Sequence, residues 1–261
     1  MTTAAPTTTS MLVKAGLSAV LAGGQLAETA RSTVALAHKG SLRDIVTQAD
    51  LDISQALTQR LTAPCWTVIS EEGPTSAARP DTFWVIDPID GTVNFSHGLP
   101  QYAISAGWVE QGICQLGVVC APALDELYFT LTPGRSLLNG KPFTHEHLSW
   151  DEALIAASFA AQASAVQYSL FQQVNESTRG CLRTGSAALN LCWAAVGKLQ
   201  AAYGFNAKLW DVAGALAIAS AAGCEVRLRQ LPGALTLDYC VGSREVVEQL
   251  VGLAQAQGLW E

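Results

Sequence analysis

Charged side chains are scarce in this sequence. Asp, Glu, Lys and Arg make up 14% of its 261 residues, whereas an average domain contains about 25%. The 15 basic residues are outnumbered by 22 acidic ones, and the formal net charge is -7. Nucleic-acid binding needs clustered Lys and Arg that displace counterions. The composition therefore argues against a nucleic-acid partner, and an anionic substrate would need metal ions to neutralise it.

Paired cysteines and uninterrupted apolar runs are also missing. The seven cysteines are scattered and never form a CxxC pair, which argues against a disulfide framework or a zinc ribbon. No run of about 20 apolar residues lacks a charge, so no membrane span is expected. The apolar segment 11–23 is interrupted by Lys14, and no basic residue precedes it, unlike a signal peptide. These absences predict a cytoplasmic protein without a membrane partner.

The length suits one large domain or two small lobes. We expect residues 1–10, which are rich in Thr, to form a disordered tail. Residues 11–261 are expected to form a single domain, with lobes of about 11–150 and 151–261. Because 49% of the residues are hydrophobic, some apolar surface remains to be covered, and a homo-oligomer would cover it.

Hydrophobic periodicity separates helical from extended segments. The helical pattern covers residues 11–38, 47–61, 164–176, 185–197, 210–223 and 243–257. Runs rich in β-branched and aromatic residues predict strands at 66–70, 83–87, 102–109, 113–121, 126–132, 153–159, 199–205, 225–231 and 235–242. Asn139-Gly140 suits a tight hairpin turn. Layers of helix and partly antiparallel sheet indicate an α/β or α+β sandwich.

Acidic residues stand at the ends of several of these elements. Asp50 opens a helix, Glu71 follows the strand "WTVIS", Asp87 and Asp90 follow "FWVI", and Asp211 opens the helix "WDVAGALAIA". Strand ends at one edge of a sheet can converge. Crowded carboxylates repel one another unless hard divalent cations neutralise them, and oxygen ligands suit Mg²⁺. The pattern therefore predicts a magnesium site.

The segment "DPIDGT" combines a metal site with an anion site. Pro88 stiffens the turn, so Asp87, the Ile89 carbonyl and Asp90 can face one point. Gly91 and Thr92 present backbone N–H groups at a helix start, and such donors favour phosphate. Metal ions beside phosphate oxygens polarise phosphorus and generate hydroxide near neutral pH. The segment therefore indicates phosphate chemistry.

Each acid taken singly has a structural interpretation as a solvated turn residue or a helix cap. Asp211 in "LWDVAG" suits an N-cap, and we interpret Asp44, Asp52, Asp81 and Asp125 in this structural way. His145 and His147 in "THEHL" have the spacing of a metal pair. No further His or Cys stands nearby, so a solvated loop is favoured for both.

Two long segments identify a family. "WVIDPIDGTVNFSHGLP" followed by "WDVAG" resembles the signatures of the inositol monophosphatase family of Mg²⁺-dependent, lithium-sensitive phosphatases. Supporting pieces occur in the family's order: "DIVTQAD", "SEE", "PALDELYF", "NGKPF" and "GSAALNLCWAAVGKL". The resemblance covers nearly everything after residue 12. It implies a layered αβαβα sandwich, a homodimer, and two or three Mg²⁺ ions that assist attack of water on a phosphate monoester.

The resemblance also implies a role for each site residue. Glu71, Asp87 and the Ile89 carbonyl match ligands of the first ion, and Asp87, Asp90 and Asp211 match those of the second. Asp50 and Thr92 match the pair that orients and deprotonates water with the help of Glu71. The Gly91 and Thr92 amides match phosphate donors. The substrate-binding residues implied are Gly185, Ser186, Ala187 and, near the third metal, Lys39.

The sequence departs from the family pattern around the substrate. Many inositol phosphatases carry a Glu seven residues before the Asp of the second motif, where it accepts substrate hydroxyls, and here that position is Gly204. Asn206 or Lys208 could replace the contact, and we expect that introducing Glu at position 204 would improve use of inositol phosphate. The basic residue common three positions before the pocket glycine is Leu182, with Arg183 adjacent.

The expected function is hydrolysis of a small polyol or metabolite phosphate, with inositol 1-phosphate as the default substrate. Histidinol phosphate, a sugar phosphate and 3′-phosphoadenosine 5′-phosphate are alternative substrates. A different reaction on a phosphorylated metabolite, or a non-catalytic binding role, stays open. The implied metal and catalytic residues are all present in this chain, which favours an enzyme.

Overall fold

The computed structural model describes residues 8–31, 36–41, 44–62, 66–74, 80–132, 134–145, 147–159, 163–230 and 234–260. The helices are α1 (Thr8–Ala30), α2 (Gln48–Thr62), α3 (Thr92–Ser96), the 3-10 helix η1 (Pro122–Leu124), α4 (Ala165–Ser177), α5 (Ala187–Ala195), α6 (Leu209–Ala221) and α7 (Arg244–Ala256). The strands are β1 (Leu36–Ser41), β2 (Asp44–Thr47), β3 (Val68–Ser70), β4 (Thr82–Asp90), β5 (Ala103–Glu110), β6 (Ile113–Ala121), β7 (Glu126–Thr132), β8 (Arg135–Leu138), β9 (Lys141–Phe143), β10 (Leu154–Ser158), β11 (Gly180–Leu182), β12 (Ala201–Lys208), β13 (Glu225–Arg229) and β14 (Thr236–Gly242).

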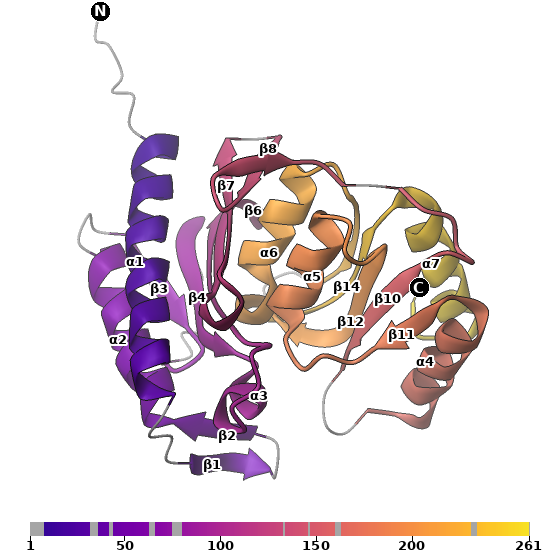
Figure 1. Ribbon diagram of the computed structural model, residues 1–261, viewed down its shortest axis with the longest axis horizontal. Helices are drawn as coiled ribbons and strands as arrows, with labels where there is room; N and C mark the ends of the chain where they lie inside the picture. Colours follow the sequence, from indigo (N-terminus) through magenta and orange to yellow (C-terminus); the bar gives the residue numbers. More distant parts are fainter. Residues whose placement is uncertain are drawn as a thin grey trace, which may run out of the picture.

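These elements stack in five layers (Figure 1). Helices α1 and α2 cover one face of a sheet of order β3-β4-β5-β6-β7-β8-β9. Helices α5 and α6 lie between that sheet and a second sheet of order β11-β10-β12-β14-β13. Helices α4 and α7 cover the outer face of the second sheet, and β1 and β2 form a separate hairpin. The expected αβαβα sandwich is confirmed.

Strand β4 is covered on both faces. Trp84 and Ile86 belong to the core beneath α1 and α2, whereas Phe83 and Val85 belong to the core around α5 and α6. Successive strand residues point to opposite faces, so a strand between two helical layers needs apolar residues at every position. This requirement explains the continuous apolar run in "FWVI", which leads directly to the acids at the end of the strand.

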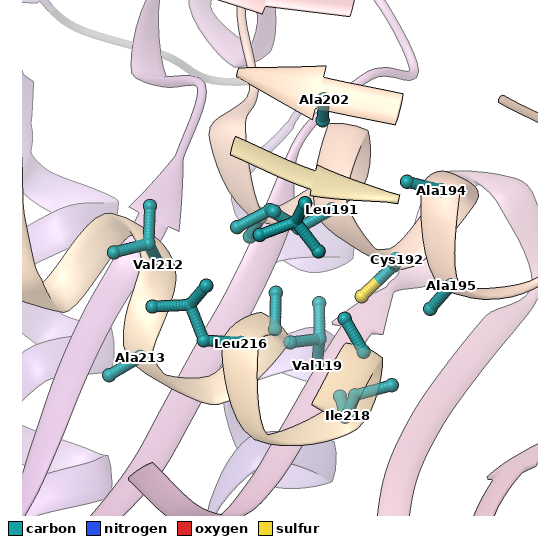
Figure 2. Packing of buried hydrophobic residues seen from close by; sticks show 14 of the residues in the cluster. Val119, Leu191, Cys192, Ala194, Ala195, Ala202, Val212, Ala213, Leu216 and Ile218 are labelled. Atoms are coloured by element: carbon teal, nitrogen blue, oxygen red, sulfur yellow. The ribbon is translucent and has the colours of Figure 1, made fainter. Parts of the chain in front are cut away.

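The layer between the two sheets is built from small and aliphatic side chains. Figure 2 shows Val119 of β6 and Ala202 of β12 on either side of Leu191 from α5 and Leu216 from α6. Every α6 residue from Val212 to Ala219 is buried. A helix that is apolar all round is a core helix, because here neighbouring layers enclose it.

Three glycines let α6 approach the first sheet closely. A Cβ atom added at Gly117 of β6 would lie 1.8 Å from the carbonyl oxygen of Gly214, and one added at Gly107 of β5 would lie 2.8 Å from the Gly214 nitrogen. Backbone atoms cannot yield as a flexible side chain can. The glycine of the "WDVAG" segment therefore belongs to a backbone contact that sets the distance between α6 and the sheet.

The N-terminal region differs from the sequence prediction. A helix over 11–38 was expected, but α1 ends at Ala30, and residues 36–41 form β1. Residues 8–10, expected in the disordered tail, are helical, and residues 1–7 lie outside the described part. Gly23 and Gly24 lie within α1, and a Cβ added there would lie 2.8 Å from Leu57 and 3.3 Å from Cys120, respectively. They allow the helix to pack closely against its neighbours.

Helix α1 also differs from the expectation that no segment could span a membrane. By length and composition alone, Thr9–Ala30 is long and apolar enough to do so, with a mean hydropathy of 1.2. In this fold 44% of the 18-residue stretch that has this hydropathy is buried. Residues such as Val13 and Val20 pack into the core beneath the sheet. Lys14 lies on the exposed side. Here the apolar pattern serves packing within the protein.

The Gly117–Gly214 contact predicts a large stability difference between two Gly→Ala variants. Gly117→Ala forces a methyl group against backbone, so we expect a loss of at least about 3 kcal/mol in the free energy of unfolding, or failure to fold. Gly252→Ala on α7 adds a methyl group into open space and should stabilise the protein by about 0.5–1 kcal/mol. Urea denaturation of both variants tests this. Equal stabilities would contradict the packing argument.

Candidate active site

The ends of β3 and β4 bring three acids to one edge of the first sheet. The two strands are parallel, and the Glu71 N–H donates to the Ile86 carbonyl at 3.2 Å. The register of β4 against β5 shifts between Asp87 and Asp90, where Pro88 lacks an N–H and cannot continue the ladder. The Ile89 N–H turns instead to Asp87 Oδ1 at 3.0 Å. Asp87 and Asp90 are both buried.

Asp50 in the first turn of α2 reaches the same region. Its Oδ2 accepts from the Thr47 N–H at 2.7 Å and from the Thr47 hydroxyl at 2.6 Å. Thr92 Oγ1 lies 3.2 Å from Asp50 Oδ1 and 3.0 Å from the Ile89 carbonyl oxygen. The hydroxyl has one proton for these two acceptors. Asp50 and Thr92, separated by 42 residues in the chain, are therefore in direct contact.

The Asp90 carboxylate lies at the start of α5. It accepts from the Ser186 hydroxyl, from the Ala187 N–H at 3.2 Å and from the Ala188 N–H at 2.8 Å. Ser186 is the N-cap of α5, and its hydroxyl oxygen also accepts from the Leu189 N–H. The first N–H groups of a helix have no partner within the helix. Asp90 thus satisfies donors that would otherwise be orphaned.

Burial and mutual repulsion raise the pKa values of the acids. Burial raises the pKa of Asp87 well above its usual range, and the charges of Glu71, Asp90 and Asp211 raise it further. Burial also raises the pKa of Asp50. The pKa of Asp90 rises to about 6, chiefly through burial and against the hydrogen bonds that it accepts. Burial and then the charges of Asp90 and Glu71 raise the pKa of Asp211. These acids form one interacting cluster.

The cluster has the chemistry of a divalent-cation site. All its donors are oxygen atoms, the kind that Mg²⁺ prefers, and a cation would relieve the repulsion that raises their pKa values. Among the described residues, no three Asp, Glu, His or Cys side chains are arranged as a ready coordination shell. Asp90 is turned to the start of α5, and Asp211 Oδ2 accepts from the Lys208 N–H at 3.2 Å at the start of α6. The oxygen donors suit the metal, and in this arrangement Asp90 and Asp211 are bonded to the starts of two helices.

Gly91 and Gly185 meet although they are far apart in the chain. Gly91 has φ 95° and Gly185 has φ 92°, values that favour glycine. A Cβ at Gly91 would lie 3.4 Å from the Gly185 carbonyl oxygen, and one at Gly185 would lie 2.8 Å from the Asn94 side chain. The expected phosphate-binding and substrate-binding segments are therefore neighbours.

Asn94 is a residue that the sequence analysis missed. Its side-chain amide donates to the Gln101 carbonyl at 2.6 Å and to the Thr184 carbonyl at 2.8 Å. The residue is buried, so these bonds hold α3 against the loop before α5. The available signal was a polar Asn inside the otherwise apolar end of "DGTVNF". A polar residue that becomes buried there, next to Phe95, needs hydrogen-bond partners.

A cavity of about 320 Å³ opens beside Asp90 and Asp211. Of the expected pocket residues, Gly185 and Ala187 line it, while Ser186 is buried with its hydroxyl on Asp90. Lys39 lies on β1, and its side chain is outside the described part. The other lining residues come from β10, β12 and the segments that follow β10 and β11: Ala157, Ser158, Phe159, Arg183, Phe205, Asn206, Ala207 and Lys208.

The expectation that Glu could serve at position 204 is wrong. A Cβ at Gly204 would lie 2.5 Å from the ring of Tyr239 and 2.9 Å from the Ser158 carbonyl oxygen. Tyr239 is fully buried, so its ring cannot swing away into solvent. The ring of Tyr239, from the neighbouring strand β14 to which Gly204 is paired, occupies the space that a side chain at position 204 would need.

His145 also differs from the expected solvated loop. It is buried. Its backbone N–H donates to the Ala222 carbonyl at 3.1 Å, and its ring Nδ1 lies 2.7 Å from the Ala194 carbonyl oxygen. His147 is exposed, as expected. These contacts join the loop after β9 to the ends of α5 and α6 and lie apart from the acidic cluster.

Comparison with known proteins places the chain among characterised relatives. The model of the inositol monophosphatase family matches residues 9–256. The "Fructose-1,6-bisphosphatase/inositol-1-monophosphatase" of Thermotoga maritima is 33% identical over 190 residues, covering 71% of this chain and 72% of that protein. The "Putative Nus factor SuhB" of Neisseria meningitidis serogroup B is 30% identical over 250 residues, covering 93% and 94%.

The fold agrees with solved structures as well. The Thermotoga maritima IMPase structure superposes with a TM-score of 0.84 at 26% identity, covering 95% of this chain and 98% of that one. The chain therefore belongs to the inositol monophosphatase family.

Proposed function

We propose that the protein is a Mg²⁺-dependent phosphomonoesterase that hydrolyses a small polyol or metabolite phosphate. The observation that carries the proposal is the cluster of buried carboxylates with raised pKa values beside a cavity. Phosphatase chemistry is the property of the family to which the chain belongs, and that family is generally metal-dependent. A cluster of this kind is costly to keep without a cation, which supports a metal-dependent role.

We assign the metal-holding role to five groups. Glu71, Asp87, the Ile89 carbonyl, Asp90 and Asp211 would hold two or three ions, following the family pattern. Bound Mg²⁺ would polarise the phosphate and lower the pKa of water. We assign Asp50 and Thr92, with Glu71, to orienting the attacking water and taking its proton. Their hydrogen bond supports a joint role.

The remaining assignments concern the substrate. The Gly91 and Thr92 amides bind the phosphate, Gly185 and Ala187 border the leaving group, and Ser186 acts through its bond to Asp90. Lys39 is carried over from the resemblance as a substrate contact. In the reaction, a water oxygen bonds to phosphorus, the bond to the leaving oxygen breaks with its electron pair, and that oxygen takes up a proton. The products are an alcohol and inorganic phosphate.

We further propose a cytoplasmic homodimer. Six of the seven cysteines lie in the described part of the chain, and all six are free thiols, which suits a reducing compartment. The low content of charged residues and exposed apolar side chains such as Tyr168 and Leu182 support association of two copies.

A partner-binding role is the second candidate function. The observation that favours it is the 30% identity, over 93% of this chain, to a protein named as a putative Nus factor. Such a role would not require turnover. We rank this role second because the acidic residues expected for catalysis are all present. The experiment in the next paragraph separates the phosphatase role from the binding role.

Activity should depend on Asp90. With Mg²⁺, we expect phosphate release from at least one of inositol 1-phosphate, histidinol phosphate, a sugar phosphate and 3′-phosphoadenosine 5′-phosphate. Asp90→Asn removes a charge from the cluster and should lower kcat/KM at least about a hundredfold. Asp52→Asn, on an exposed residue of α2, is the matched control and should retain activity. Full activity of Asp90→Asn would refute the metal assignment, and silence of the wild type across the panel would favour the binding role.

The metal-free protein should lose stability as pH rises. The pKa of Asp90 is about 6 in the folded state against an ordinary 3.8, so the folded state binds this proton more tightly. The resulting stabilisation is present below about pH 4 and lost as pH rises through about 6, and it amounts to about 3 kcal/mol. Urea denaturation with EDTA at acidic and neutral pH measures it. Mg²⁺ should restore stability at neutral pH, and an identical pH profile for Asp90→Asn would contradict the assignment to Asp90.

A further inference from the structure

The cavity beside the acidic cluster is lined by two cations as well as by acids. Its lining includes Asp90 and Asp211 together with Arg183 and Lys208. Arg183 follows β11 and Lys208 ends β12, so the two cations come from separate segments. If phosphate binds to metal ions held by these acids, the leaving part of the substrate extends into this cavity.

Arg183 is held in a defined position. Its Nη2–H donates to the Phe159 carbonyl at 2.9 Å, and its Cζ lies 4.7 Å from the centre of the Phe159 ring. A guanidinium group has five N–H donors, so this bond uses one of them. Stacking on the ring restricts the side chain further. The charge is therefore positioned in the cavity before any ligand arrives.

The backbone of Lys208 is held at the start of α6, where Lys208 is the N-cap. Its backbone N–H bonds to Asp211 Oδ2, so its Cα position follows that of an acid of the cluster. Burial raises the pKa of Asp211, and the positive charge of Lys208 opposes that rise. Lys208 is exposed.

Besides its charged residues, the cavity offers the neutral polar side chains of Ser158 and Asn206 to a polyol. Among the described residues, Asp90 and Asp211 are the carboxylates that line it, and both belong to the cluster assigned to metal binding. Position 204, where a carboxylate would accept hydroxyls, is blocked by the Tyr239 ring. Phe159 and Phe205 make parts of the wall apolar. A positioned guanidinium and a nearby lysine beside apolar walls match an anionic group better than a ring of hydroxyls.

We propose that Arg183 and Lys208 bind a second anionic group on the leaving group, so that the preferred substrates are phosphate monoesters carrying a further carboxylate or phosphate. This inference rests on the proposed phosphatase function and deepens it. The bonds broken and formed are those of ordinary monoester hydrolysis. The second anion stays on the alcohol product.

Two matched substrate pairs test the inference. 2-Phosphoglycerate differs from glycerol 2-phosphate by a carboxylate in place of a hydroxymethyl group. 3′-Phosphoadenosine 5′-phosphate differs from adenosine 3′-monophosphate by the phosphate at the 5′ position. With Mg²⁺, we expect kcat/KM to be at least about tenfold higher for the charged member of at least one pair, as a charge-assisted hydrogen bond allows. The pair that shows the larger ratio identifies the second anion as carboxylate or phosphate.

Variants separate charge recognition from structural damage. Arg183→Gln and Lys208→Gln should each lower the ratio of kcat/KM between the charged and the uncharged substrate of a pair towards one. Lys208→Arg keeps the charge and should retain that ratio. Lys141→Gln and Arg227→Gln change exposed cations that do not line the cavity and should leave the ratio unaltered. Thermal melting of each variant checks its folding.

Three outcomes would overturn the inference. Ratios near or below one in an active wild type would refute it and leave the phosphatase proposal standing. A ratio that survives both Gln substitutions would also refute it, because the preference would then arise elsewhere. Absence of phosphate release from all four compounds and from the polyol and sugar phosphates would remove the proposed function itself.

Discussion

Repulsion among buried carboxylates at the end of β4 is the constraint on which the site depends. Asp87 and Asp90 sit between two helical layers, where an ionised group is expensive. The chain compensates locally. Thr47 donates to Asp50, and the first N–H groups of α5 donate to Asp90. These bonds hold the acids in place but do not cancel their charge, since the pKa values stay raised. This residual repulsion is what the proposed cation would relieve.

The position of α6 is the second requirement. Asp211 stands in the first turn of this helix, and Gly214 one turn later contacts the backbone of β6. Because backbone meets backbone there, the helix has little freedom to slide, and the distance between Asp211 and the end of β4 follows from it. Lys208 is the N-cap of the same helix. The glycine contact that positions Asp211 therefore also positions the backbone of Lys208, which lines the adjoining cavity. The proposed metal site and the proposed leaving-group contact thus depend on the same packing of α6.

Residue patterns predicted much of the fold and left particular parts out. Strands such as β4 and helices such as α6 were predicted within a few residues, because strong apolar patterns mark their burial. The helix expected over 11–38 was wrong beyond Ala30, since an Ala-rich pattern does not mark its own end. Asn94 and His145 were misjudged for a common reason. Each is polar, and only the elements packed around it supply the hydrogen-bond partners that keep it buried.

The sequence by itself determined the family, the layered architecture and the set of candidate site residues, because "DPIDGT" and "WDVAG" specify chemistry through residue type and spacing. Tertiary structure alone decided how those residues meet. It set Asp90 on the start of α5, filled the space at Gly204 with the ring of Tyr239, and joined Arg183 and Lys208 in one cavity. The physical reason is that these contacts join residues of separate elements, whose distances follow from how the layers pack.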